Sequence, residues 1–267
     1  MKRIYILYII AAAAILIFLG VTFSSKRKKE EVIIAPKPVF YKEAESAFNS
    51  GDFLKARALF QQALETAEGV EELNKIQGKI EMVNMKIIFS PVLDECSIQY
   101  EVRPNDALAK IAKKFKTTVN LIKRANNLQS DTIRPGQKLK VNNCRFSISV
   151  DKSMNILFLK QNDQVIKKYI VSTGKNNNTP VGQFKIVNKE VEPTWFRSGA
   201  VIPPDSPDNI LGSRWMGFDL KGYGIHGTTA PEDLGKQVTL GCIRMKNEEV
   251  EELFDIIPVG TEVVIVD

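Results

Sequence analysis

The stretch Gly224-Ile225-His226-Gly227-Thr228 holds the only histidine of this 267-residue chain, and Thr239-Leu240-Gly241-Cys242-Ile243-Arg244 holds one of its three cysteines. A nearby histidine favours the cysteine thiolate, which is the form that attacks carbonyl groups. The surrounding glycines let backbone approach closely and offer N–H groups to a developing oxyanion. The pattern indicates an acyl-transfer site, and the alternative is an inert buried cysteine beside a structural histidine. A zinc site needs at least three ligands, so we expect no metal.

These two stretches and three upstream segments resemble the signature of the L,D-transpeptidase catalytic domain, which is also called the YkuD domain. The likeness covers about residues 145–267. The upstream segments, in chain order, are Ser172-Thr173-Gly174, Thr179-Pro180-Val181-Gly182-Gln183-Phe184 and Asn209-Ile210-Leu211-Gly212-Ser213-Arg214-Trp215-Met216-Gly217-Phe218. Many family members have a histidine where this chain has Leu240, and asparagine or arginine where it has Arg244.

The resemblance implies a cysteine acyltransferase that acts on the tetrapeptide stems of peptidoglycan and needs no cofactor. Cys242, activated by His226, would form a thioester with the stem and release D-alanine. An amine acceptor would then give a 3-3 cross-link, whereas water would give L,D-carboxypeptidase action. The Gly227 carbonyl would orient the imidazole. The N–H groups of Gly241 and Cys242 are candidates for the oxyanion hole.

Four further side chains near the two catalytic candidates are expected to contact substrate. Arg244 could hold a carboxylate of the stem or brace its own loop, since guanidinium groups do both. Thr239 could hydrogen-bond near the sulfur. Tyr223 and Trp215 could wall the cleft or belong to the hydrophobic core.

The middle of the chain, residues 97–142, predicts strand, helix, helix, strand order, with helices over 107–115 and 119–125. Its pattern is similar to the LysM family, whose modules bind chains of N-acetylglucosamine in a shallow groove. Asn105 stands where the family pattern has glycine, and Ala107 stands where it has serine or threonine. A LysM fold that no longer binds sugar is therefore the alternative. By this resemblance the groove is lined by Arg103, Pro104, Asn105, Asp106, Ala107, Leu108, Leu128, Gln129, Ser130, Asp131, Thr132, Ile133 and Arg134.

The charge of the chain, +6 overall, is concentrated in this middle segment. Residues 97–142 hold ten Lys and Arg against three Asp and Glu, whereas residues 145–267 hold fourteen against sixteen. No aromatic platform or phosphate-binding loop accompanies the basic residues, so we expect no nucleic acid partner. An anionic cell-wall surface is the favoured partner, and a solvated helical face is the alternative.

The LysM resemblance also bears on the other two cysteines. Cys96 and Cys144 flank the LysM segment, whose terminal strands should lie side by side and bring the two thiols within reach of a disulfide. A disulfide would indicate an oxidising compartment. Two unlinked buried thiols are the alternative.

The N-terminus predicts a membrane anchor at residues 1–25, because the chain carries no charge from Ile4 to Phe23. A cleavable signal peptide is the alternative. Lys and Arg on both sides of the span leave its orientation open by charge, but the wall-directed modules favour a body outside the cytoplasmic membrane, in the bacterial cell envelope. Residues 26–38 predict a linker, since they end in Ala35-Pro36-Lys37-Pro38.

Residues 39–95 show helical periodicity and predict one tetratricopeptide-like (TPR-like) helical hairpin followed by a third helix. A single repeat offers a limited concave face, so it is a spacer or a docking surface for a protein partner.

The catalytic segment, residues 145–267, is rich in β-branched runs broken by Asp, Asn and Gly, and its one clear helix is expected at 247–254. We therefore expect a multi-domain α+β protein with a mainly β, sandwich-like catalytic domain. The function indicated is a membrane-anchored peptidoglycan L,D-transpeptidase. A non-catalytic wall-binding protein that uses LysM for adhesion is the alternative.

Overall fold

The computed structural model describes residues 37–197 and 199–267. Residues 36–267 form one compact unit. The anchor expected at 1–25 and most of the expected linker lie outside the described residues. No helix within 37–197 and 199–267 combines the length and apolarity needed to cross a bilayer.

Three helices open the described chain: α1 (Lys37–Asn49), α2 (Phe53–Glu65) and α3 (Val70–Ile88). The linker predicted to reach residue 38 is therefore wrong at its end, because α1 already begins at Lys37. Proline is tolerated in the first turn of a helix, where its missing N–H would have no intrahelical partner.

The turn between α1 and α2 is set by two residues that the sequence made prominent. Gly51 has a φ of +84°, which glycine adopts without strain. Asp52 caps α2 by accepting a hydrogen bond from the Lys55 N–H at 3.2 Å. The three helices share a hydrophobic core that includes Ala56 and Phe60.

The LysM segment folds as β1 (Ser97–Glu101), α4 (Leu108–Phe115), α5 (Val119–Ala125) and β2 (Lys138–Asn142). β1 and β2 pair antiparallel, so the strand, helix, helix, strand prediction is confirmed. The module has a hydrophobic core of its own. Directly outside the paired strands, a disulfide joins Cys96 and Cys144.

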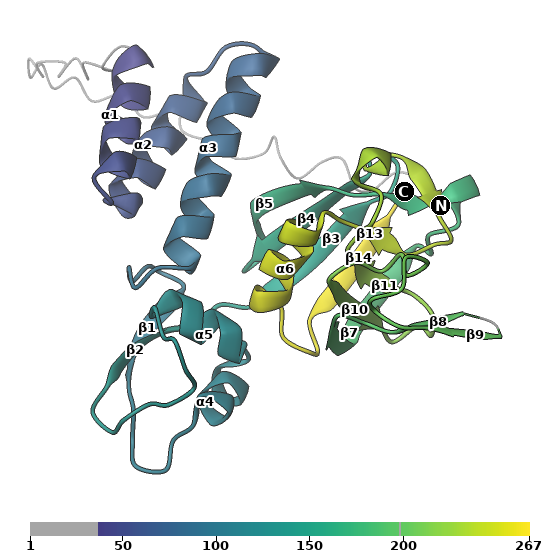
Figure 1. Ribbon diagram of the computed structural model, residues 1–267. Coiled ribbons are helices and arrows are strands. Elements are labelled where there is room, and N and C mark those ends of the chain that lie inside the picture. The colour runs from purple at the N-terminus through teal and green to yellow at the C-terminus, as the bar shows by residue number, and fades with distance from the viewer. Residues whose placement is uncertain (1–36, 198) are drawn as a thin grey trace, which may run out of the picture. The chain divides into compact units, whose positions relative to one another are not determined.

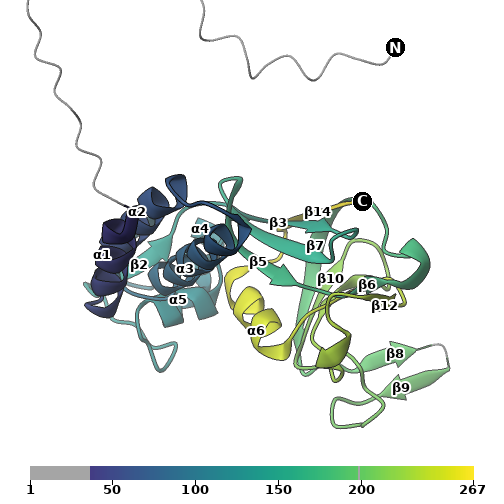
Figure 2. The same cartoon turned by 90° about the horizontal axis from the view of Figure 1, so that it is seen from above.

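The catalytic segment is built on an eight-stranded mixed sheet with the order β13-β11-β10-β7-β14-β3-β4-β5. Two small two-stranded sheets, β12-β6 and β8-β9, lie outside it. Figures 1 and 2 show the β8-β9 hairpin extending away from the large sheet. The strands are β3 (Phe146–Asp151), β4 (Ile156–Gln161), β5 (Gln164–Ile170), β6 (Thr173–Gly174), β7 (Gly182–Val191), β8 (Trp195–Arg197), β9 (Ala200–Ile202), β10 (Arg214–Phe218), β11 (Gly224–His226), β12 (Gln237–Thr239), β13 (Ile243–Arg244) and β14 (Glu262–Val266), with short 3-10 turns at Lys175–Asn177 and Pro231–Asp233.

The catalytic segment is mainly β, as predicted, and its large sheet is continuous. β7 is ten residues long and pairs with β14 through its first half and with β10 through its second half. The register between β7 and β10 shifts at Gly217 and Phe218, as in a β-bulge. One long strand thus joins the two halves of the sheet.

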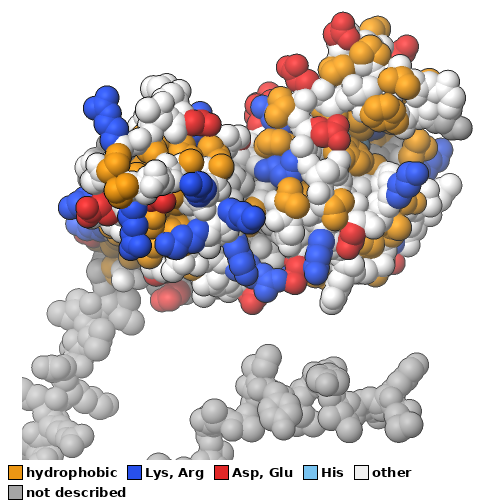
Figure 3. All heavy atoms as spheres, turned by 90° about the horizontal axis from the view of Figure 1, so that it is seen from below, with side chains coloured by type: hydrophobic (Ala, Val, Ile, Leu, Met, Phe, Trp, Pro, Cys, Tyr) orange, Lys and Arg blue, Asp and Glu red, His pale blue; other side chains and the backbone are white. Residues whose placement is uncertain are grey.

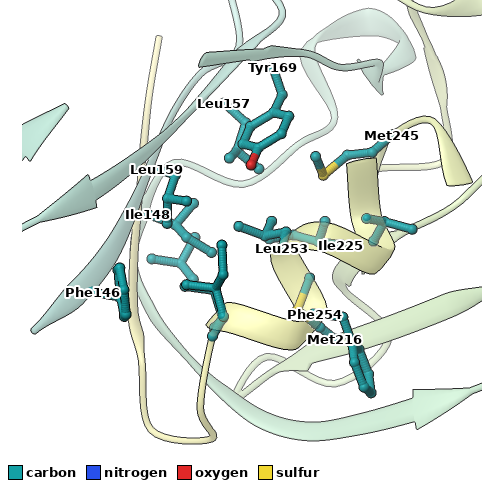
Figure 4. Close-up of a cluster of buried hydrophobic side chains, with 14 of the residues drawn as sticks. Phe146, Ile148, Leu157, Leu159, Tyr169, Met216, Ile225, Met245, Leu253 and Phe254 are labelled. Atoms are coloured by element: carbon teal, nitrogen blue, oxygen red, sulfur yellow. The ribbon is translucent and has the colours of Figure 1, made fainter. Parts of the chain in front are cut away.

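The helix α6 (Asn247–Ile256) lies against this sheet, as Figures 1 and 2 show. Its buried side chains Val250, Leu253 and Phe254 belong to the same core as residues of both halves of the sheet. In Figure 4, Leu253 and Phe254 lie among side chains of β3, β4, β10 and β11. Fully burying one such side chain contributes about 1.5–3 kcal/mol, so α6 holds the bent sheet in shape.

Two elements from outside the catalytic segment also enter this core. Met85 and Ile88 of α3 and Leu121 of α5 are buried in it. Asn84 of α3 donates a hydrogen bond to the Ile166 carbonyl of the edge strand β5 at 3.0 Å. The helical and LysM segments are therefore packed against the catalytic segment at these points.

Candidate active site

Two neighbouring strands bring the two catalytic candidates close in the fold. β11 pairs parallel with β13, with Ile225 opposite Ile243 and His226 opposite Arg244. Alternate residues of a strand point to opposite faces. Ile225 and Ile243 are fully buried in the core, so His226 and Arg244 point to the other face, and Cys242 directly precedes β13.

His226 is 2% exposed, and the backbone of the next residue holds its imidazole at the end of β11. Its Nδ1 lies 2.7 Å from the Gly227 carbonyl oxygen, so Nδ1 carries the proton and donates it in this hydrogen bond. Nε2 is then the unprotonated nitrogen. Burial, together with the nearby Arg244 charge, lowers the imidazole pKa to about 4, although hydrogen bonds with the backbone of Gly227 and Leu211 act to raise it.

Trp215 lies beside this imidazole on the next strand. It is paired with His226 in the β10-β11 register, and the two rings stack with centroids 6.0 Å apart and planes inclined by 22°. A Cβ on Gly224 would come within 2.8 Å of the Trp215 ring, so glycine at 224 lets the indole approach. Trp215 is half-buried and therefore covers one face of the His226 ring.

Cys242 is half-buried and is the only free cysteine. Its Sγ lies 3.5 Å from the Gly222 carbonyl oxygen. Burial raises the thiol pKa to about 11, although the Gly224 backbone and the Arg244 charge both lower it. Together with the depressed pKa of His226, this makes the resting pair a neutral thiol and a neutral imidazole.

The loop before Cys242 is braced from within by Thr239. Its hydroxyl donates to the Cys242 carbonyl at 2.6 Å and accepts the Gly241 N–H at 3.1 Å. Thr239 is 5% exposed, so its role is to shape the loop and not to contact substrate as expected. The Gly241 N–H is likewise engaged, which argues against the expected oxyanion role of Gly241.

Gly241 instead has a conformational role. Its φ is +136°, and a Cβ there would lie 2.6 Å from the Tyr223 ring. Tyr223 thus packs over the loop backbone, is half-buried, and contacts the main core. Of the two expected roles of Tyr223, packing against the core is the one observed, and the role of cleft wall stays a prediction.

Two residues that carried no predicted role hold the same loop from the other side. Thr179 is 1% exposed; its hydroxyl donates to the Gly241 carbonyl at 2.9 Å and accepts the Gly174 N–H at 2.7 Å. The Asn178 side-chain amide donates to the Leu240 carbonyl at 2.9 Å. Thr179 lies in one of the segments that resemble the family signature, and this resemblance could have pointed to it. Its hydrogen-bond partners could not be predicted in this way, because they are distant in sequence.

Asn247, at the start of α6, organises the loop that follows His226. Its Oδ1 accepts the N–H groups of Ser213 and Thr228 at 3.2 and 3.0 Å, and its Nδ2 donates to the Thr228 carbonyl at 2.9 Å. A Cβ on Gly227 would lie 2.1 Å from this Oδ1, so Gly227 must lack a side chain. Only a helix start was expected at Asn247.

Arg244 is 9% exposed and faces the same side of the sheet as His226. Its backbone exchanges two hydrogen bonds with Ser172, at 2.9 and 2.8 Å. Its Nη1 lies 3.9 Å from Asp233 Oδ2, and its buried Nε has no hydrogen-bond partner among the described residues. A buried donor of this kind is available to an incoming acceptor group.

The described residues contain no group of three or more His, Cys, Asp or Glu side chains that could hold a metal ion.

The LysM candidates divide into loop-forming and exposed residues. Asp106 accepts hydrogen bonds from the Tyr100 hydroxyl and the Arg103 N–H, both at 2.8 Å, and so shapes the first loop. Leu108 is 2% exposed in the module's core, which corrects its expected place in the groove. Leu128 and Ile133 also pack partly against that core.

The two departures from the LysM pattern have structural consequences. Asn105 has a φ of +67°, a conformation that asparagine tolerates better than most residues with a side chain. Ala107 is the N-cap of α4 and makes no side-chain capping bond. A serine or threonine there would cap the helix.

The remaining candidates in the two loops are exposed or half-buried. Asp131 pairs with Lys123 at 2.7 Å. Arg103 and Pro104 line a hollow of about 470 Å³ together with Pro135. Most basic residues of the module are exposed. Figure 3 views the molecule from the side where α4 and α5 lie in Figure 1, and shows Lys and Arg side chains gathered there. The exposed or half-buried candidates are Arg103, Pro104, Asn105, Asp106, Ala107, Leu128, Gln129, Ser130, Asp131, Thr132, Ile133 and Arg134.

Comparison with known proteins agrees with this fold and site. Residues 145–265 match the family model of the L,D-transpeptidase catalytic domain (YkuD), and residues 100–142 match that of the LysM domain. The chain is 46% identical over 126 residues to the L,D-transpeptidase homologue YqjB of Bacillus subtilis, an alignment that covers 45% of this chain and 70% of YqjB. It is 34% identical over 174 residues to the L,D-transpeptidase homologue YkuD of Bacillus licheniformis, which covers 62% of this chain and 97% of that protein.

The chain is therefore an acyltransferase of the class that uses a cysteine nucleophile. It belongs to the L,D-transpeptidase family with the YkuD catalytic domain, and it carries a LysM domain. These two domains indicate peptidoglycan binding outside the cytoplasm.

Proposed function

We propose that the protein transfers acyl groups from peptidoglycan tetrapeptide stems to an amine through a thioester on Cys242. The observation that carries this proposal is the arrangement of His226. Its Nδ1 is fixed on the Gly227 carbonyl at 2.7 Å, which leaves Nε2 as a neutral base on the strand that pairs with β13, directly after Cys242. A base of this kind can take the thiol proton as the sulfur attacks.

In the first step the Cys242 sulfur bonds to the stem carbonyl carbon, and its proton passes to His226 Nε2. The oxyanion is held by the Cys242 N–H, since the Gly241 N–H is engaged by Thr239. Collapse expels D-alanine, whose nitrogen takes the proton from the imidazolium. The acceptor amine then attacks the thioester, loses a proton through His226, and restores the thiol.

Two further parts of the proposal concern binding. The Arg244 guanidinium, with its unpaired Nε, binds a carboxylate of the stem. The exposed LysM loop residues, chiefly Arg103 to Ala107 and Gln129 to Arg134, bind the glycan strand. The expected membrane anchor at residues 1–25 would hold the body in the cell envelope, and an unassigned protein partner could dock on the TPR-like helices.

The test is release of D-alanine from a disaccharide-tetrapeptide by the purified protein, with the products separated by mass. Wild type should release D-alanine and join two stems in the presence of an amine acceptor, while Cys242→Ala should do neither. D-alanine release without joined product would assign L,D-carboxypeptidase action. Equal behaviour of wild type and Cys242→Ala, with sacculus binding retained, would leave only a wall-binding role.

A further inference from the structure

The helix α6 contacts both the catalytic strands and the LysM module. At its first residue, Asn247 holds the loop that carries Gly227 and Thr228. Its middle packs under β10 and β11 through Val250 and Leu253. Its last turn carries Asp255, which points away from the catalytic site toward the LysM helix α5.

Asp255 makes three hydrogen bonds to α5 and to the residue that caps it. One carboxylate oxygen accepts the Asn120 side-chain amide at 2.7 Å, and the other accepts Arg124 Nη1 at 2.9 Å. The Asp255 backbone carbonyl accepts the hydroxyl of Thr118, the residue that also caps α5. Leu121 N–H donates to that same hydroxyl at 2.9 Å, so the helix cap and the contact between modules share one group.

The surroundings of Asp255 make this contact stronger than an ordinary surface ion pair. The Asp255 side chain is 21% exposed. The Arg124 guanidinium lies 3.4 Å from the centre of the Phe89 ring, which fixes its plane. Leu121, one residue beyond Asn120, is buried in the catalytic core. Exposed pairs contribute little, but a half-buried carboxylate with both oxygens bonded and an apolar anchor beside it restricts movement.

The contact also borders the loop expected to bind glycan. A hollow of about 420 Å³ is lined by Asp255 of α6 and by Leu128 and Gln129 of that loop. A glycan held by that loop would keep one orientation relative to the helix that also supports the catalytic strands.

We propose that Asp255 is a positioning residue that fixes the LysM module to the catalytic domain, so that a glycan strand bound by LysM presents its stems to Cys242 in one orientation. This inference rests on the proposed function. Small displacements of bound substrate can cost a large factor in rate, so loosening the contact penalises a polymeric substrate that engages both modules. A soluble stem that engages only the catalytic site does not depend on it.

The test compares two substrates in the full-length protein: intact sacculi and a soluble disaccharide-tetrapeptide. Asp255→Ala should lower turnover on sacculi about tenfold, while turnover of the soluble stem and the amount of protein bound to sacculi stay at the wild-type level. Glu248→Ala is the matched control, because Glu248 is an exposed carboxylate on the same helix. It should change neither activity.

A second variant approaches the contact from the LysM side. The double variant Asn120→Ala, Arg124→Ala should reproduce the loss, and adding Asp255→Ala to it should cost little more, since all three residues form one contact. Equal turnover on both substrates in every variant, or an equal fall on both, would overturn the positioning role. Failure of wild type on the soluble stem would instead overturn the proposed function.

A distance measurement provides an independent readout. In a Cys242→Ala background, spin labels at Lys113 on α4 and Gln183 on β7, both exposed, should give a narrow distance distribution. Asp255→Ala should broaden it. An unchanged narrow distribution would overturn the proposal even if the activity on sacculi fell.

Discussion

At the catalytic site, some side chains take part in the proposed reaction and others hold the loops in place. His226 and Cys242 are the reacting pair in the proposed mechanism, and their neighbours Thr239, Thr179 and Asn247 hold backbone in place. Thr239 and Thr179 are buried and Asn247 is half-buried, and their side chains bond to loop amides and carbonyls. Buried polar groups cost free energy unless they are paired, so such contacts restrict the loops strongly.

Removal of the Asn247 amide should disturb the site without touching the reacting atoms. In Asn247→Ala the N–H groups of Ser213 and Thr228 lose their shared acceptor, and we expect the free energy of unfolding to fall by about 2–3 kcal/mol. The loop that carries Gly227 should loosen, and kcat/KM on a soluble stem should fall about tenfold or more.

Denaturant unfolding and D-alanine release measure the two effects of Asn247→Ala. Asn143→Ala is the control, because Asn143 is exposed and makes a backbone hydrogen bond only. Wild-type activity in Asn247→Ala would show that the loop holds its shape without this amide.

Burial of His226 makes stability depend on pH. The pKa of His226 is about 4 in the folded protein and about 6.5 in an unfolded chain. The unfolded state therefore binds more protons between these values, so stability is fully present above about pH 6.5 and is lost as the pH falls toward 4. The loss is on the order of 3 kcal/mol.

Denaturant unfolding at a series of pH values measures this dependence. His226→Gln should be less stable overall but should lack this slope between pH 4 and 6.5. If the stability of His226→Gln fell with pH as steeply as that of wild type, other groups would cause the acid sensitivity.

Among the helices, the two in the LysM module begin in different ways. α4 starts at Ala107 without a side-chain cap, whereas α5 starts at Thr118, whose hydroxyl accepts the Leu121 N–H at 2.9 Å. The first LysM loop depends on this uncapped helix, since Asn105 and Asp106 directly precede it.

A cap at the start of α4 should stabilise the LysM module. Ala107 has an extended backbone, with φ −138° and ψ 151°, which suits an N-cap residue. We expect Ala107→Ser to raise the stability of the module by about 1 kcal/mol. Ala109→Ser, in the exposed face of the same helix, should be neutral or slightly destabilising. Thermal melting of both variants measures the two changes in stability. An equal change in Ala107→Ser and Ala109→Ser would exclude a capping role for the introduced hydroxyl.

Across the molecule as a whole, the segments are joined by contacts that are few but specific. The disulfide closes the LysM segment on itself, α3 and α5 enter the catalytic core, and Asp255 binds α5. Reduction of the disulfide should therefore destabilise the LysM module. The catalytic sheet should be affected less, because it has its own large core.

Loss of the disulfide should destabilise LysM far more than the catalytic domain. Cys96 and Cys144 are separated by 48 positions, and the chain-entropy model gives about 4 kcal/mol for a loop of this length. We expect Cys96→Ser, Cys144→Ser to bind sacculi weakly at raised temperature while keeping its activity on a soluble stem. Sacculus pull-down over a temperature series measures this. Loss of the soluble activity in parallel would show that the two modules unfold as one.

Much of the site was predictable from local sequence. Glycines at 224, 227 and 241 and the paired His226 and Cys242 indicated close backbone approach and nucleophilic chemistry, and the family signature placed them in one domain. The helices, the two LysM strands and the mainly β character of the catalytic segment were also predicted, because hydrophobic periodicity reports local structure directly. The hydrogen bond between the Gly241 N–H and the Thr239 hydroxyl was not predicted, since it depends on how the loop closes.

The sequence by itself identified the modules and the reacting groups. It could do so because each motif is a short run of residues whose chemistry is local. The continuity of the sheet through β7, the bracing by Thr179 and Asn247, and the attachment of LysM through Asp255 needed the folded chain. Each of these contacts joins residues far apart in sequence, and no periodic pattern records which distant polar groups will meet once the core has formed.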